Sequence, residues 1–349
     1  MNVLYQQRDF PIFQNRMYGS REEAINCPKG DVVLIENELT GLVYNAAFRS
    51  EMMVYDDQYQ NEQAVSPLFQ SHLRDVQYII DSRMGRSRLA EVGCGKGYFL
   101  ETLLQAGFDI TGFDPTYEGS SPRIQREYFG PGTVEKADGL ILRHVLEHIE
   151  NPVDFLFQLS EANERQGLIY IEVPCFDWIC EHRAWFDIFY EHVNYFRLVD
   201  FDRMFGRTIE SGRLFGGQYL YVVADLATLR EPEIDLDNRV ILPEDFMGSI
   251  DATLSSVEHQ AVVWGGASKG VIFSLLKARR GDPVDLVVDI NPSKQGKFLA
   301  GTGLMVMSPE VLEASILSGA TIYVMNSNYL EEIRQMTNNK YEYVGVIDE

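Results

Sequence analysis

Apolar and polar positions change their spacing along the chain, and this change predicts where strands and helices alternate. Residues 89–92 are apolar except for Glu91, and glycines follow at positions 93, 95 and 97. After them, apolar side chains stand at positions 99, 100, 103 and 104, which places them on one face of a helix. Gly107 then stands where a helix is expected to end. The pattern predicts a strand, a glycine turn and a helix.

The same alternation continues to residue 175, with further apolar strands expected at 108–113, 138–142 and 167–173. Strands that alternate with helices predict a parallel, doubly wound sheet. A second alternation starts at His259, with strands expected at 261–264, 284–289, 321–325 and 343–347 and a second glycine turn at Gly265–Gly270. The fold class is therefore predicted to be α/β, with two Rossmann-like sheets.

The remaining segments suggest how the chain divides. Two short strands are expected at 31–35 and 41–44, and a helix near 67–80. Residues 176–205 are rich in aromatic side chains without a clean period, a strand is expected at 217–223, and residues 231–243 resemble an acidic linker before a helix that ends near 257. We predict a small N-terminal α+β unit at 1–70, a Rossmann-like domain at 71–230 and a second Rossmann-like domain at 231–349.

Chemistry is expected beyond the ends of the predicted strands, because parallel α/β sheets bind ligands there. Asp114 follows the strand at 108–113, where a carboxylate can accept hydrogen bonds from two ribose hydroxyls. Arg143 and His144 follow the strand at 138–142. Glycines in the first turn let a ligand approach the backbone closely. A nucleotide site is expected here, although glycines alone leave the kind of nucleotide open.

The motifs EVGCGKG (91–97), Asp114 and LRHVLEHIENP (142–152) together resemble the class I S-adenosylmethionine (SAM)-dependent methyltransferases. The resemblance implies SAM as the methyl donor and S-adenosylhomocysteine as the product. It implies that the glycine turn passes the amino-acid part of SAM and that Asp114 holds the ribose. A Rossmann-type domain with another nucleotide is the alternative. The residues expected to border the cofactor are Glu91, Gly93, Cys94, Gly95, Gly97, Asp114, Arg143 and His144.

The order of parts over nearly the whole chain resembles the three-domain sugar C-methyltransferases of antibiotic deoxysugar pathways. Besides the SAM motifs, the resemblance rests on residues 30–48, YEHVNYF (190–196), and GGASKG (265–270) with residues 287–303. It implies a nucleotide-linked keto-sugar as the methyl acceptor. The N-terminal unit of that family usually binds zinc through CxxC pairs. Here Asn37 and Thr40 stand where one pair falls and Cys27 is left alone, so we predict no metal.

Methyl transfer to a weak nucleophile needs a base that removes a proton from the acceptor. By the resemblance, His192 is the proton acceptor and Glu191 is its partner or a substrate ligand. His148 matches a family position near the SAM methyl, and Tyr59 belongs to a segment that reaches over the active site. Adjacent side chains cannot both face inward on a regular element, so Glu191 and His192 need an irregular backbone, or only one of them is catalytic. Packing roles are the alternative for each of these residues.

Charge and composition exclude some partners. The net charge of −22 makes nucleic acids and anionic membranes unfavourable, and it suits a cationic substrate. No apolar run approaches the roughly 18 residues of a membrane span, and the N-terminus lacks a signal-peptide pattern, so we expect a cytoplasmic protein. The four cysteines form no CxxC pair and are expected to be reduced. Nothing in the sequence indicates an oligomeric state.

Three functions follow from these patterns. The first is a SAM-dependent methyltransferase for a small polar metabolite in natural-product or sugar biosynthesis, with C-methylation of a nucleotide-linked keto-sugar as its most specific form. The second is N-methylation of a cationic guanidine or amine, which the acidic composition and the altered zinc unit favour. The third is a non-catalytic SAM-binding subunit, which would bind SAM without forming S-adenosylhomocysteine.

Overall fold

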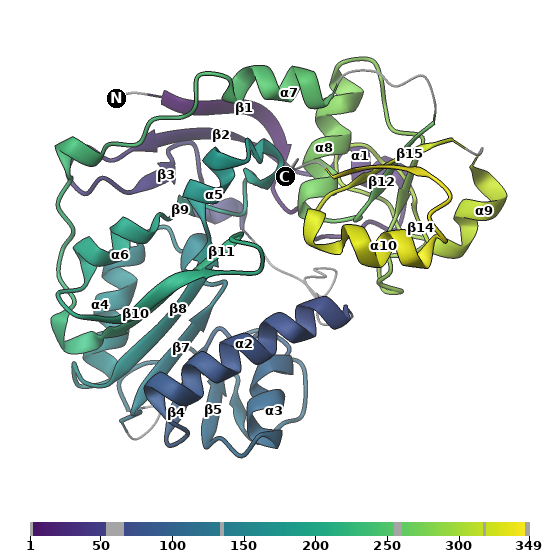
Figure 1. Cartoon of the computed structure of the whole chain (residues 1–349). Coiled ribbons are helices and arrows are strands. Elements are labelled where there is room, and N and C mark those ends of the chain that lie inside the picture. Colours follow the sequence, from purple (N-terminus) through teal and green to yellow (C-terminus); the bar gives the residue numbers. More distant parts are fainter. Residues whose placement is uncertain (1–2, 54–65, 133–135, 255–259, 317–318, 346–349) are drawn as a thin grey trace.

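The computed structural model describes residues 3–53, 66–132, 136–254, 260–316 and 319–345. These residues form three sheets, of four, seven and five strands, which follow one another along the chain except for one strand, β9, that returns to the first sheet (Figure 1). The seven-stranded and five-stranded sheets are the two α/β units that the sequence predicts. No helix among the described residues is long and apolar enough to span a membrane.

The N-terminal sheet is antiparallel and has the order β1-β2-β3-β9. The strands predicted at 31–35 and 41–44 are confirmed as β2 and β3, whereas the edge strand β1 was not predicted. The fourth strand, β9, comes from the aromatic segment at 176–205, so this sheet is not built from residues 1–70 alone. The elements are β1 (Val3–Pro11), α1 (Arg21–Ile25), β2 (Lys29–Glu36), β3 (Val43–Asn45), η1 (Ser50–Met52) and β9 (Asn194–Tyr195).

The seven-stranded sheet has the order β10-β11-β8-β7-β4-β5-β6. Its five strands from β8 to β6 are parallel, as predicted. β11 pairs antiparallel with β8, and β10 pairs antiparallel with β11. Strand β10 was not predicted, because its sequence TIESGRL lacks an apolar run. The strands are β4 (Leu89–Val92), β5 (Ile110–Phe113), β6 (Ile124–Gln125), β7 (Gly139–Arg143), β8 (Leu168–Pro174), β10 (Thr208–Leu214) and β11 (Tyr219–Asp225).

Helices cover both faces of this sheet. On one face α2 and α3 lie side by side (Figure 1), and their buried side chains, including Leu73 and Leu100, share a cluster with Ile141 and Tyr170 of the strands. On the other face α4 buries Leu156 and Leu159. The aromatic segment forms only short pieces, as its irregular pattern predicts. The elements are α2 (Pro67–Met84), α3 (Tyr98–Gln105), η2 (Leu146–His148), α4 (Pro152–Ala162), α5 (Phe176–Glu181), η3 (Trp185–Asp187), α6 (Leu198–Met204) and η4 (Leu226–Thr228).

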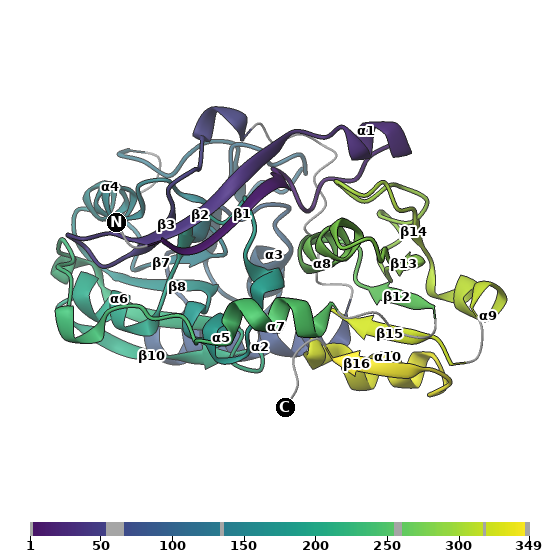
Figure 2. The same ribbon diagram turned by 90° about the horizontal axis from the view of Figure 1, so that it is seen from above.

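The five-stranded sheet is wholly parallel, with the order β14-β13-β12-β15-β16. Alternate residues of β12 face opposite layers, so Val263 packs with α8 while Val262 and Trp264 pack with α10 (Figure 2). The elements are η5 (Leu236–Asn238), α7 (Phe246–Thr253), β12 (Ala261–Trp264), α8 (Ser268–Arg279), β13 (Leu286–Val288), β14 (Val306–Met307), η6 (Pro309–Val311), α9 (Leu312–Ser315), β15 (Thr321–Val324), η7 (Ser327–Tyr329), α10 (Leu330–Met336) and β16 (Glu342–Gly345).

Candidate functional site

The first glycine turn connects β4 to α3 through three residues with positive φ. Gly93, Gly95 and Gly97 have φ of 73°, 54° and 80°. A Cβ at Gly93 would collide with Val145 and one at Gly97 with Ile124, so both positions need glycine for packing as well as for backbone conformation. A Cβ at Gly95 would meet nothing within 4 Å. Gly95 therefore faces open space, where a ligand can lie against the backbone.

Asp114 closes this turn from the end of β5. One of its carboxylate oxygens accepts the backbone N–H of Gly95 at 2.7 Å, and the other accepts the backbone N–H and the hydroxyl of Thr116 at 2.8 and 2.7 Å. A carboxylate has about four acceptor positions, so these three bonds leave capacity for a ligand hydroxyl. Asp114 thus fixes the turn and still offers an acceptor beside the open position at Gly95.

Glu91 lies beneath the turn at the end of β4 and is 3% exposed. Its Oε2 is buried and has no hydrogen-bond partner among the described residues. Burial raises the pKa of Glu91 to about 7, with Asp114 adding to the rise and Arg143 opposing it. A buried carboxylate oxygen without a partner fits a cationic ligand, and SAM carries both a sulfonium and an ammonium group. The residues of the turn therefore fit SAM.

Glu172, a buried carboxylate on β8, contacts Arg143 and His144 at the end of β7. It is fully buried, and its carboxylate accepts the Tyr170 hydroxyl at 2.6 Å and lies 3.1 Å from His72 Nε2. Arg143 Nη2 and His144 Nε2 each lie 3.0 Å from its Oε1. Burial favours the neutral acid, but these cationic neighbours outweigh it and hold the pKa of Glu172 well below its usual range. Arg143 and His144, expected at the cofactor, are thus also anchored to Glu172.

His144 is held in a strained and charged state. Its φ of 51° is a left-handed conformation that side chains other than glycine rarely adopt. Its Nδ1 lies 3.4 Å from Glu147. Burial opposes its charge, yet the hydrogen bonds to Glu147 and Glu172 raise the pKa of His144 to about 9. His144 and His148 do not share a helix face, because the helical turn η2 begins only at Leu146.

Three of the polar side chains around η2 and the loop before β9 come together. Glu147, His148 and His192 offer donor atoms that all lie within 4.8 Å of one another, a spacing that a metal ion could also use. The rings of His148 and His192 are 5.0 Å apart. Burial, with His148 adding to it, holds the pKa of His192 well below its ordinary value. His192 is therefore neutral near pH 7, which is the state that a general base requires.

Comparisons with known proteins agree with this geometry. A family model described as "Methyltransferase domain" matches residues 59–208, and a model described as "C-methyltransferase C-terminal domain" matches residues 244–346. The protein is a SAM-dependent methyltransferase. Its middle sheet is the class I SAM-binding sheet, with SAM as the cofactor. No curated protein matches the chain of this methyltransferase.

Solved structures resemble the methyltransferase over about half of its chain. A Pyrococcus horikoshii OT3 protein is 10% identical, covering 49% of this chain and 99% of its own, with a TM-score of 0.38. The 1,6-didemethyltoxoflavin-N1-methyltransferase of Burkholderia thailandensis, solved with S-adenosylhomocysteine, is 14% identical, covering 52% and 94%, with a TM-score of 0.34. A SAM-dependent methyltransferase from Archaeoglobus fulgidus is 18% identical, covering 46% and 95%, with a TM-score of 0.35.

The side chains of Glu191 and His192 point to different partners. The Glu191 carboxylate accepts the backbone N–H of Gln14 at 2.9 Å, which ties the loop to the N-terminal unit. Its carbonyl oxygen lies 2.8 Å from Nδ1 of His148. His192 instead lies in the group with Glu147 and His148. The loop between η3 and β9 is irregular. This backbone lets the adjacent side chains of Glu191 and His192 contact different partners, as expected from the sequence.

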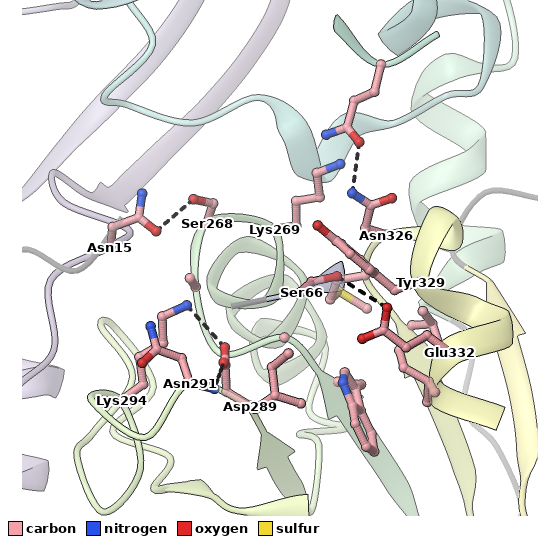
Figure 3. Close-up of a pocket in the computed structure, with 18 of the residues that line it drawn as sticks. Asn15, Ser66, Ser268, Lys269, Asp289, Asn291, Lys294, Asn326, Tyr329 and Glu332 are labelled. Carbon is pink, nitrogen blue, oxygen red and sulfur yellow. Dashed lines mark hydrogen bonds and ion pairs between the residues drawn. The ribbon is translucent and has the colours of Figure 1, made fainter. Parts of the chain in front are cut away.

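A cavity of about 200 Å³ lies at the C-terminal edge of the five-stranded sheet of the methyltransferase (Figure 3). Its walls come from all three parts of the chain: Asn15 from the N-terminal segment, Tyr219 from β11, and Lys269 from the second glycine turn. The Asn15 carboxamide accepts the hydroxyl of Ser268 at 3.1 Å (Figure 3). The cavity is therefore lined by both Rossmann-like sheets and by the N-terminal segment between β1 and α1.

The second glycine turn repeats the hydrogen bonds of the first. Asp289 follows β13 as Asp114 follows β5, and its carboxylate accepts the backbone N–H of Gly266 at 2.8 Å. Its other oxygen accepts the backbone N–H of Asn291, two residues on, at 2.8 Å. Lys294 adds an ion pair to Asp289 at 3.1 Å (Figure 3). Turn and acid therefore have the same arrangement in both sheets, at the edge where nucleotides bind.

Tyr219 lies between the cavity and His144 at the end of β7. Its ring meets the His144 ring edge-on at 4.6 Å between centroids, and it also lines the cavity. Lys269 reaches the aromatic segment, where its Nζ lies 3.0 Å from Asp187 and 5.2 Å from the centre of the Trp178 ring. His144, at the end of β7, and the cavity are therefore neighbours across one aromatic ring.

The remaining expected residues are placed as follows. The sulfur of Cys94 packs against Gly112 inside the first glycine turn. Burial raises the pKa of the Cys94 thiol. Tyr59 and Tyr55 lie outside the described residues. At the position where the sequence resemblance implies a cysteine pair, the carboxamide oxygen of Asn37 accepts the backbone N–H groups of Leu39 and Thr40 at 2.9 and 3.0 Å. Asn37 thereby closes this turn with its own side chain.

Sequence reasoning missed Glu172 and Glu147 as members of the site. Glu172 ends an apolar strand just as Glu91 does, so the same signal was available in GLIYIEV. Glu147 stands within the LEHI motif, where only its burial beside His192 distinguishes it from a packing residue. Lys269 belongs to the second glycine turn, and nothing in its local pattern indicates that it reaches Asp187 in the other sheet's aromatic segment.

Proposed function

We propose that this methyltransferase transfers the methyl group to a carbon of a nucleotide-linked keto-sugar. One observation carries the proposal: the Gly266–Asp289 contact repeats the Gly95–Asp114 contact, in a cavity whose lining residue Tyr219 also contacts His144 of the SAM-binding sheet. One such turn serves the nucleoside of SAM, and the second serves a nucleotide carried by the acceptor. The cavity thus supports an acceptor that spans both sheets.

Charged side chains of both signs line the cavity. Lys269 and Lys294 lie there together with Asp289 and Glu332. Each lysine is paired with an acid, Lys269 with Asp187 and Lys294 with Asp289. The charges of the lining therefore balance, and the choice of a nucleotide-linked acceptor over a cationic one rests on the repeated glycine turn.

SAM supplies an electrophilic methyl group when it is bound by Glu91, the glycine turn and Asp114. The protein's own task is to hold the acceptor in line and to remove its proton. We propose His192 as the proton acceptor, with His148 beside it and Glu191 holding the loop against Gln14. Tyr59 is proposed as a further acceptor contact. We also propose the division at 1–70, 71–230 and 231–349, with the middle part for SAM and the last part for the acceptor nucleotide.

Isothermal titration of dTDP and of UDP into the enzyme saturated with S-adenosylhomocysteine tests the acceptor site. We expect binding of at least one nucleotide, and about a tenfold or greater loss of affinity in Asp289→Ala, the scale of a lost hydrogen bond to a charged group. Asp81→Ala, which removes a partly exposed acid on α2, is the control and should bind as the wild type does. Failure of both nucleotides to bind would contradict a nucleotide-linked acceptor.

A further inference from the structure

Glu147 is a buried carboxylate that faces His192. It is 1% exposed, and its Oε2 has no hydrogen-bond partner among the described residues. His192 is 8% exposed, and its Nδ1 is likewise buried without a partner in the described part of the chain. The donor atoms of both residues belong to the group that lies within 4.8 Å. Each of these two neighbouring buried side chains therefore has a polar atom without a hydrogen-bond partner among the described residues.

The backbone fixes this approach from both sides of His192. The carbonyl oxygen of Glu191, the residue before it, lies 2.8 Å from Nδ1 of His148. The backbone N–H of Val193, the residue after it, donates to the carbonyl oxygen of Glu147 at 2.8 Å. Both neighbours of His192 are thus bonded to the Glu147–His148 turn. These bonds hold the backbone of His192 beside the turn that carries Glu147.

The surroundings of His192 make a carboxylate necessary for its charged form. Burial disfavours the imidazolium, and His148, His144 and Lys269 add positive charge near it. A buried cation without a counter-charge is costly. Glu147 is the member of the group that supplies negative charge. Its other oxygen is oriented by His144, which is itself anchored to Glu172.

We infer that Glu147 is a positioning residue for the base: it accepts a hydrogen bond from the His192 ring and stabilises the imidazolium formed during methyl transfer. The inference rests on the proposed function of His192. In that step the acceptor C–H bond breaks, its proton forms an N–H bond on His192, and its electron pair forms the new C–C bond to the methyl group. The C–S bond of the donor breaks, its electron pair stays on sulfur, and the proton later leaves His192 for solvent.

The test is NMR of enzyme labelled with ¹⁵N in the histidine rings and saturated with S-adenosylhomocysteine, which requires no acceptor. Loss of signals in His192→Gln identifies His192 among the six histidines. We expect a ring N–H of His192 with the downfield proton shift of a hydrogen bond to a carboxylate. In Glu147→Gln this proton should move upfield and exchange with solvent about tenfold faster or more. Glu150→Gln, which removes an exposed carboxylate three residues away, should keep the wild-type signal.

Glu147→Asp keeps the charge and is expected to restore part of the downfield shift, which a purely structural role would not require. Should Glu147→Gln fail to fold, the wild-type spectrum decides, because a His192 ring without a downfield N–H overturns the inference. One equivalent of a divalent metal on the purified enzyme, whose removal by a chelator changes the His192 signals, would overturn it as well. Absence of methyl transfer to keto-sugars would contradict the proposed substrate and leave this spectrum unaffected.

Discussion

The carboxylate of Glu191 accepts the backbone N–H of Gln14 across 177 positions of sequence, at 2.9 Å. Both residues are fully buried. The bond joins the loop that carries the proposed base to the N-terminal segment, whose next residue, Asn15, lines the cavity of about 200 Å³. The N-terminal segment therefore contributes to the cavity that we propose for the acceptor.

Removing the Glu191 side chain should destabilise the protein by more than it alters SAM binding. Glu191→Ala leaves a buried backbone N–H unsatisfied, which costs about 1–3 kcal/mol, whereas Glu191→Gln retains an acceptor oxygen and should cost less. Urea unfolding of the two variants measures the difference. Equal stability of wild type and Glu191→Ala would show that the bond to Gln14 contributes nothing.

Asp114→Ala should weaken SAM binding by roughly 1.5–3 kcal/mol, the contribution of a hydrogen bond to a charged group. The variant also frees the N–H of Gly95, so its fold must be checked by circular dichroism. Asp289→Ala is the matched control, because it removes the equivalent contact from the other turn and should leave SAM affinity unchanged. If SAM affinity falls in Asp289→Ala and not in Asp114→Ala, SAM binds at the five-stranded sheet, which would contradict this account.

SAM binding should release protons near neutral pH. Burial raises the pKa of Glu91 to about 7, so the free enzyme holds this carboxyl partly protonated. The cationic donor favours the ionised carboxylate, and affinity should therefore rise about 3- to 10-fold as the pH rises from roughly 6 to 8. Calorimetry in buffers of different ionisation enthalpy measures the released protons. Glu91→Gln should abolish the effect, and an unchanged proton release in that variant would exclude Glu91 as its source.

His192→Ala should slow methyl transfer by about 10²–10⁴ and leave SAM affinity intact. Burial and the neighbouring His148 hold the pKa of His192 well below 6.5, so the neutral base persists as the pH falls through that value. Protonation of His192 should therefore not reduce the rate to half of its maximum at pH 6.5. Near-normal turnover of His192→Ala would reassign the base, and His148→Ala would then be the next variant to assay.

Local pattern predicted the parts of the molecule that depend on neighbours in sequence. The turn from Glu91 to Gly97 and the acid at 114 follow from apolar runs, glycines and strand ends, and both lie where they were expected. The repeat at Gly266 and Asp289 was visible as a second strand, glycine turn and acid. Helix α2 was found because its apolar positions recur with helical spacing.

The parts that were missed depend on contacts between distant segments. Glu172 meets His72 across 100 positions, and no periodicity within either segment indicates that meeting. Strand β10 is stabilised by pairing with β11, and not by an apolar run of its own. The place of β9 beside β3 likewise arises only when the aromatic segment folds back onto the N-terminal sheet. Tertiary pairing, not local propensity, decided each of these features.

The most direct test of the proposed chemistry is to locate the transferred methyl group. The enzyme is mixed with SAM labelled with ¹³C in its methyl group and with dTDP-4-keto-6-deoxyglucose or, separately, a guanidine or amine acceptor, and the product is examined by carbon–proton NMR. We predict a new methyl signal bonded to a sugar carbon next to the ketone, together with one equivalent of S-adenosylhomocysteine. A methyl group on nitrogen, or SAM that remains intact with every acceptor, would contradict C-methylation of a nucleotide-linked keto-sugar.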